Sequence, residues 1–149
     1  MFDLVIADHV LFYCEDIPQV LAECRRVLKN GGRFLCSTYG KQHMREITDL
    51  VQQFHKEIVL SAEVLYERFG LENGENLLAP YFPEIQMRRY EDAIEIAEAE
   101  PLISYILSCH GNQNQLLLNQ YKEFREFVSA RVADGFHITK DAGIFLCRK

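Results

Sequence analysis

Short apolar runs and amphipathic stretches alternate along the first 40 residues of the chain. Residues 2–7 (FDLVIA) form an apolar run too short for a helix, which is typical of a strand covered on both faces of a parallel sheet. Residues 33–38 (RFLCST) form a second short run, and residues 16–28 between them carry apolar side chains every three or four positions. This order predicts two parallel strands joined by a right-handed crossover helix.

Capping residues are expected at both ends of this helix. Asp16 is a good N-cap, with Gln19 as its capping partner and Pro18 in the first turn. Asn30-Gly31-Gly32 supplies residues that accept a left-handed conformation, so we expect the helix to end there.

Helical and strand patterns continue through the rest of the chain. The acidic segment 91–100 (EDAIEIAEAE) is interpreted as a solvated stretch that leads into a helix. No long linker or repeat interrupts the pattern, so we expect one α/β domain over residues 1–149. The expected elements are helices within 41–80, a strand over 83–90, helices from Pro101 to Gly111 and from Tyr121 to Gly135, and a closing strand over 143–148 (GIFLCR).

Composition narrows the classes of function. The chain has 149 residues, 48% of them hydrophobic, and a formal net charge of −6, which disfavours binding to nucleic acid or to an anionic membrane. Five cysteines without a Cys-x-x-Cys motif indicate reduced thiols, and the dispersed histidines suggest no metal site. No segment reads as a membrane span or signal peptide, so a cytoplasmic protein is expected.

Candidate chemistry lies in two loops, 7–13 and 38–40. In parallel α/β sheets ligands bind beyond the carboxyl ends of the strands, and both loops leave predicted strands at that edge. Their acceptors, imidazoles and aromatic faces suit a cationic or purine-bearing ligand, although ordinary loop packing would use the same residues. These side chains belong to Asp8, His9, Phe12, Tyr13, Tyr39 and His43.

One known family has this succession of segments. Residues 2–40 (FDLVIADHVLFYCEDIPQVLAECRRVLKNGGRFLCSTYG) resemble the fourth strand, following helix and fifth strand of class I S-adenosylmethionine-dependent methyltransferases. VLKNGG is the most telling part, with Asn30 where that family usually has proline. The resemblance implies a partial Rossmann-like methyltransferase fold, the C-terminal half of the domain, with strands four to seven, flanking helices and an antiparallel closing strand between the fifth and sixth. Residues 41–80 would be a helical insertion over the active-site side.

The resemblance also implies site residues. Ala7, Asp8 and His9 match the loop after the fourth strand, where they would touch the methionine part of the cofactor S-adenosylmethionine or the acceptor. His9 could accept a proton from the acceptor, and Tyr13 or Tyr39 could orient it. The family's Gly-x-Gly cofactor loop occurs nowhere in this sequence, so the cofactor pocket is expected to be incomplete.

Three functions remain open. The leading hypothesis is methyl transfer to a small-molecule acceptor, in a protein completed by a missing N-terminal half, with Met1 internal to a longer enzyme, or by another subunit. A second is a non-catalytic interaction or dimerisation domain. Since residues 2–7 would be left unpaired along one edge, we expect in either case a homodimer or exchange of elements between chains, unless the missing N-terminal half covers that edge. The third, an unrelated nucleotide-binding domain such as a dehydrogenase fragment, is disfavoured by the expected antiparallel closing strand.

Overall fold

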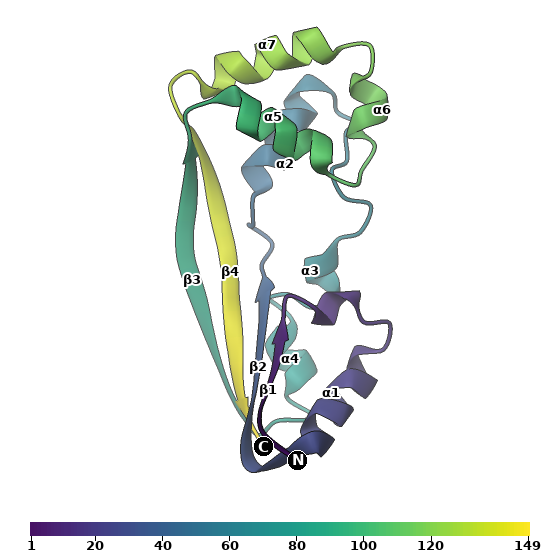
Figure 1. The fold of residues 1–149 in the computed structure, drawn as a ribbon, viewed down its shortest axis with the longest axis vertical. Helices are drawn as coiled ribbons and strands as arrows, with labels where there is room; N and C mark the ends of the chain where they lie inside the picture. Colours follow the sequence, from purple (N-terminus) through teal and green to yellow (C-terminus); the bar gives the residue numbers. More distant parts are fainter. The chain divides into compact units, whose positions relative to one another are not determined.

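The computed structural model describes residues 1–149, and four strands form one mixed sheet in the order β1-β2-β4-β3 (Figure 1). The chain is therefore mixed α/β, as the sequence predicts. The elements are β1 (Phe2–Asp8), η1 (Leu11–Tyr13), α1 (Ile17–Val27), β2 (Leu28–Tyr39), α2 (Arg45–Phe54), α3 (Leu65–Arg68), α4 (Gly74–Leu78), β3 (Glu84–Ile96), α5 (Ala99–Ser108), α6 (Gln113–Leu117), α7 (Tyr121–Val132) and β4 (Phe136–Arg148).

Strand pairing agrees with the predicted topology. β1 runs parallel to β2, with Leu4 opposite Arg33 and Asp8 opposite Ser37. β4 runs antiparallel to β2 and lies between β2 and β3 in the sheet. The parallel pair joined by α1 and the antiparallel closing strand are both confirmed.

The predicted start of α1 is confirmed, but its predicted end is wrong. The Asp16 side chain accepts a hydrogen bond from the backbone N–H of Gln19 at 2.9 Å. The helix ends at Val27, and fully buried Leu28 already has extended dihedrals, so β2 begins five residues earlier than expected. Gly31 does take a positive φ of 75°, but inside this strand, where the β1–β2 register also shifts.

β3 and β4 are longer than the sequence suggested. β3 continues to Ile96, so its predicted end at residue 90 is wrong, whereas most of residues 91–96 are exposed, as expected for a solvated segment. Ile94 and Ile96 alternate with exposed residues and pack against a core, which gives the strand a reason to continue. β4 begins at Phe136 rather than at residue 143, and in its first half only Ile138 and Asp141 are buried, so no regular apolar alternation marks it.

The chain folds into two compact units. Unit 1 comprises Met1–His43, Val64–Glu91 and Asp141–Lys149, and unit 2 comprises Met44–Glu63 and Asp92–Lys140. The segment 41–80 is thus divided: α2 belongs to unit 2, whereas α3 and α4 belong to unit 1. The single domain over 1–149 and the placement of 41–80 over an active site remain predictions.

Each unit has its own apolar core. In unit 1, Phe34 stacks on Phe82 at 5.3 Å between ring centroids, and the core includes residues of β1, α1, β2 and β4. In unit 2, α2 is one of the helices expected within 41–80, and it buries Ile47, Leu50 and Val51. These residues share a core with apolar side chains of α5 and α7. None of the helices has the length and apolar character needed to cross a bilayer.

β1 is an edge strand with one uncovered face. It pairs with β2 on one side, and Phe2, Leu4 and Ile6 are 58%, 43% and 59% exposed. The unpaired edge expected for residues 2–7 is present, but the expected burial on both faces is wrong for these three alternating positions.

Candidate functional site

The carboxyl ends of β1 and β2 meet in register. Asp8 and Ser37 are direct partners in the ladder. The buried Ser37 hydroxyl donates to Asp8 Oδ1 and accepts the backbone N–H of His9 at 3.0 Å. Ser37 therefore fixes both the Asp8 carboxylate and the turn that follows it. Ser37 was not predicted as a site residue, because its role depends on the register of the two strands.

His9 has an unusual backbone conformation. Its φ is +48°, in the left-handed region, which costs a non-glycine residue roughly 1–2 kcal/mol. The hydrogen bond from its N–H to Ser37 helps to hold this turn. The His9 ring stacks on Tyr39, with centroids 6.3 Å apart and planes 16° apart, and meets Phe12 edge-on at 6.2 Å. Strained residues of this kind are concentrated at functional sites, so His9 is a reasonable site candidate.

Tyr39 is the centre of an aromatic cluster. Its ring centroid lies 5.1 Å from that of His43, 5.4 Å from Phe12 and 6.5 Å from Tyr66. The structure thus brings Asp8, His9 and Tyr39 together at one edge of the sheet. Tyr66 was not anticipated, because no local pattern links α3 to the ends of β1 and β2.

The other two predicted site residues are less favourably placed. Tyr13 lies in η1 with 65% exposure, and it joins the cluster at its edge by packing against Phe12 at 4.7 Å. The Ala7 side chain is buried in the unit 1 core, so Ala7 can face a ligand only with its backbone. Their proposed roles remain predictions.

Two of the five cysteines, Cys36 and Cys147, are held as unreactive thiols. All five are free thiols, and Cys36 and Cys147 are buried in unit 1. Burial raises the pKa of Cys36 above its usual range and the pKa of Cys147 to about 12. Both thiols therefore stay protonated near neutral pH, whereas a nucleophile or metal ligand must be a thiolate. No three His, Cys, Asp or Glu side chains are grouped so as to hold a metal ion.

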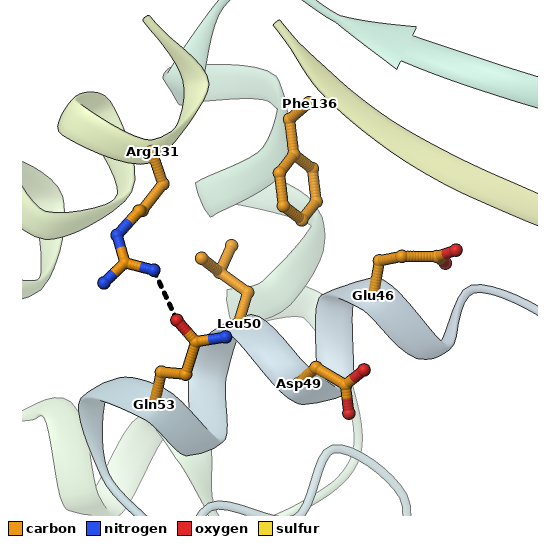
Figure 2. Close-up of a pocket in the computed structure, with 6 residues that line it drawn as sticks. All are labelled: Glu46, Asp49, Leu50, Gln53, Arg131 and Phe136. Carbon is orange, nitrogen blue, oxygen red and sulfur yellow. Dashed lines mark hydrogen bonds between the residues drawn. The ribbon is translucent and has the colours of Figure 1, made fainter. Parts of the chain in front are cut away.

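Unit 2 has a shallow groove of about 270 Å³ between α2, the end of α7 and the start of β4 (Figure 2). The Arg131 guanidinium donates to Gln53 and lies 4.8 Å from the Phe127 ring. Burial opposes ionisation of Glu46, but hydrogen bonds from Thr139 outweigh it and lower the Glu46 pKa. The charged side chains of the groove already have partners within unit 2, so we assign no chemistry to it. It is lined by Glu46, Asp49, Leu50, Gln53, Arg131 and Phe136.

The N-terminal part of the chain is similar to known proteins. The model of a family described as a methyltransferase domain matches residues 1–36. A malonyl-acyl-carrier-protein O-methyltransferase of Nitrosospira multiformis is 41% identical over 44 residues, which are 30% of this chain and 14% of that protein. A biotin biosynthesis bifunctional protein of Saccharophagus degradans is 38% identical over 48 residues, which are 32% of this chain and 9% of that protein.

Comparison of structures supports the fold. A proposed methyltransferase of Bacillus halodurans matches with a TM-score of 0.53 and 12% identity, over 99% of this chain and 64% of that one. The four-stranded mixed sheet thus resembles part of a methyltransferase fold. The chain is related to the class I S-adenosylmethionine-dependent methyltransferases. It covers only a small part of the two curated relatives and less than two thirds of the solved structure.

Proposed function

We propose that this chain forms the acceptor side of an S-adenosylmethionine-dependent methyltransferase that acts on a small molecule. The observation that carries the proposal is the junction of β1 and β2, where Asp8 and His9, within the matched residues 1–36, lie close to Tyr39. Ligands of parallel α/β sheets bind beyond such carboxyl ends. The negative net charge favours a small acceptor over a nucleic acid.

The residues present fit one part of the cofactor. The exposed Asp8 carboxylate suits an ammonium group, and the aromatic faces of the Tyr39 cluster suit a sulfonium cation. No Gly-x-Gly segment is available to approach the adenosine part. The pocket therefore needs further polypeptide, which we place along the free edge of β1.

The proposed reaction is a displacement. S-adenosylmethionine supplies an electrophilic methyl group, and its sulfur leaves as a neutral thioether when the acceptor attacks. The chain's own residues align the acceptor and exclude water. His9 accepts the proton that the acceptor hydroxyl or amine releases, and Tyr39, or Tyr13 at the edge of the cluster, orients the acceptor by hydrogen bonding. No covalent enzyme intermediate is required.

Calorimetry with S-adenosylmethionine tests this function. The isolated chain should show no binding in the micromolar range, whereas a fusion that adds a methyltransferase N-terminal half with its Gly-x-Gly loop should bind at micromolar concentrations. Asp8→Ala should weaken binding by the fusion about ten-fold, as expected for loss of one charged contact. Asp3→Ala is the matched control, because Asp3 lies at the other end of β1 and pairs with Lys29 at 2.9 Å.

Two results would overturn the proposal. One is a fusion that folds but does not bind the cofactor. The other is equal weakening by Asp8→Ala and Asp3→Ala, which would remove Asp8 from the site.

The alternative function is a non-catalytic interaction domain that forms a homodimer. The bare edge of β1 and its exposed Phe2, Leu4 and Ile6 favour it, since such edges pair readily with another strand. Sedimentation of the isolated chain should then give a dimer that Ile6→Lys dissociates. A monomer at high concentration would contradict this alternative and leave methyl transfer in place.

A further inference from the structure

The loop that follows β2 is held by two carboxylates. The backbone N–H groups of three successive residues point to acidic partners: Gly40 donates to the Asp141 backbone oxygen at 2.8 Å, and Gln42 donates to the Asp141 carboxylate at 3.1 Å. Between them, Lys41 donates to the Glu72 carboxylate at 3.2 Å. The path of residues 40–42 is therefore set by residues distant in sequence.

Arg89 lies between the same two carboxylates. Its guanidinium donates to Asp141 Oδ1 and lies 3.5 Å from Glu72 Oε1. The Asp141 side chain is 7% exposed, and a buried carboxylate of this kind is stable only when it is paired and hydrogen-bonded. Arg89 thus compensates the negative charge of the Asp141 carboxylate, which accepts the hydrogen bond of the loop amide.

Gly40 is part of the same arrangement. A Cβ at position 40 would overlap the Asp141 carboxylate and lie 2.7 Å from Glu72 Oε1. Asp141 cannot move away without giving up its bonds to Gln42 and Arg89. The absence of a side chain at position 40 lets the carboxylates reach the loop backbone.

This loop carries the aromatic side of the candidate site. Tyr39 precedes it and His43 ends it, and the His43 N–H donates to the Gly40 oxygen at 3.1 Å. The two rings lie 5.1 Å apart, and the Tyr39 ring also stacks on His9. A shift of residues 40–42 would therefore separate these rings.

We propose that Arg89 and Asp141 are positioning residues that, with Glu72, fix the loop after β2 and so hold the Tyr39 ring between those of His9 and His43. The proposal deepens the proposed function by assigning what aligns the acceptor side of that site. Arg89 and Asp141 act through the loop backbone and need not touch a substrate.

The test is an NMR comparison of the chain without any cofactor, so that its outcome is independent of methyl transfer. In Arg89→Met, measured well below its unfolding temperature, we expect the His9 and His43 ring signals to move toward those of exposed histidines. The Lys41 and Gln42 amides should exchange about ten-fold faster, as loss of one hydrogen bond permits. In Arg89→Lys, both the shift of the ring signals and the acceleration of amide exchange should be smaller. The matched control is Arg88→Met, at an exposed neighbouring position on β3.

A purely structural role would lower the unfolding temperature without moving the ring signals. Unchanged His9 and His43 signals with unchanged Lys41 and Gln42 exchange in folded Arg89→Met would overturn the proposal. If that variant does not fold, Glu72→Ala decides the question, because Glu72 is 44% exposed and contacts the same loop. It should accelerate exchange of the Lys41 amide selectively, and equal exchange to that of the unmodified chain would refute the role of the carboxylates.

Discussion

Unit 1 and unit 2 are built by different means. Unit 1 is a β-sheet unit whose core lies around a parallel strand pair, and it contains the segment matched by the methyltransferase family model. Unit 2 is mainly helical, with a core formed by α2, α5 and α7 and by apolar residues of β3 and β4. The candidate chemistry lies in unit 1, whereas the charged side chains of the unit 2 groove already have partners. The family match and the candidate site thus both lie in unit 1. A second apolar core does not imply a second site.

The largest expected effect on stability comes from removing one buried aromatic ring from each core in turn. Phe34 in unit 1 and Phe124 in unit 2 are both fully buried, so changing either to alanine should lower the free energy of unfolding by about 3–5 kcal/mol. Since the two cores share no residue, Phe34→Ala should accelerate amide exchange in unit 1 and Phe124→Ala in unit 2. Urea unfolding and amide exchange measure both quantities.

The control for this pair is Tyr90→Ala, at a position 67% exposed, which should change stability little. Equal acceleration throughout the chain by either core variant would break the comparison, because it would make the two cores one cooperative body.

Helix capping offers a smaller contrast between the units. Asp16 caps α1, so Asp16→Ala should cost about 1 kcal/mol of unfolding free energy. In unit 2, Glu98 at the start of α5 has extended dihedrals but makes no capping hydrogen bond. The shorter side chain in Glu98→Asp can reach the first turn and should add about 0.5 kcal/mol. Thermal unfolding followed by circular dichroism measures both changes. If Glu98→Asp lowers the stability, the prediction that α5 lacks a useful N-cap is wrong.

The smallest effect is a pH dependence in unit 2. The hydrogen bond that the His137 ring donates to the Glu95 carboxylate raises the pKa of His137 above its ordinary value. The stabilisation is therefore complete below the unfolded pKa of about 6.5 and is lost as the pH rises through the higher folded pKa. Both groups are exposed, so we expect Glu95→Gln to lower the unfolding temperature slightly at pH 5.5 and not at pH 8.5. An NMR titration of His137 that is identical in both chains would contradict this.

Much of unit 1 could be predicted because its signals are local. The short run 2–7 and the Asp16 cap each act within a few residues, and they gave the strand and the helix start. The full lengths of β3 and β4 could not be predicted from the sequence. The residues by which they exceed the prediction include charged side chains, whose burial depends on neighbouring strands. Asp141 is the clearest case, because a buried carboxylate carries no apolar pattern.

The candidate site was predicted only as a set of loops. Asp8, His9 and Tyr39 were found because they follow predicted strands. Ser37 and Arg89 were missed because their partners lie 29 and 52 residues away, and only the register of the sheet brings them together. The positive φ of His9 was also not predicted, since it is uncommon in every residue but glycine, even though histidine adopts it more often than most.

A mutation at the Gly40 codon would disturb the contacts that hold the loop after β2. Every missense change of a glycine codon adds a Cβ, which would displace the Asp141 carboxylate. A single base change could therefore loosen the loop while leaving Asp141, Glu72 and Arg89 unaltered. The arrangement of three charged side chains is thus encoded in part at a codon that specifies no side chain at all.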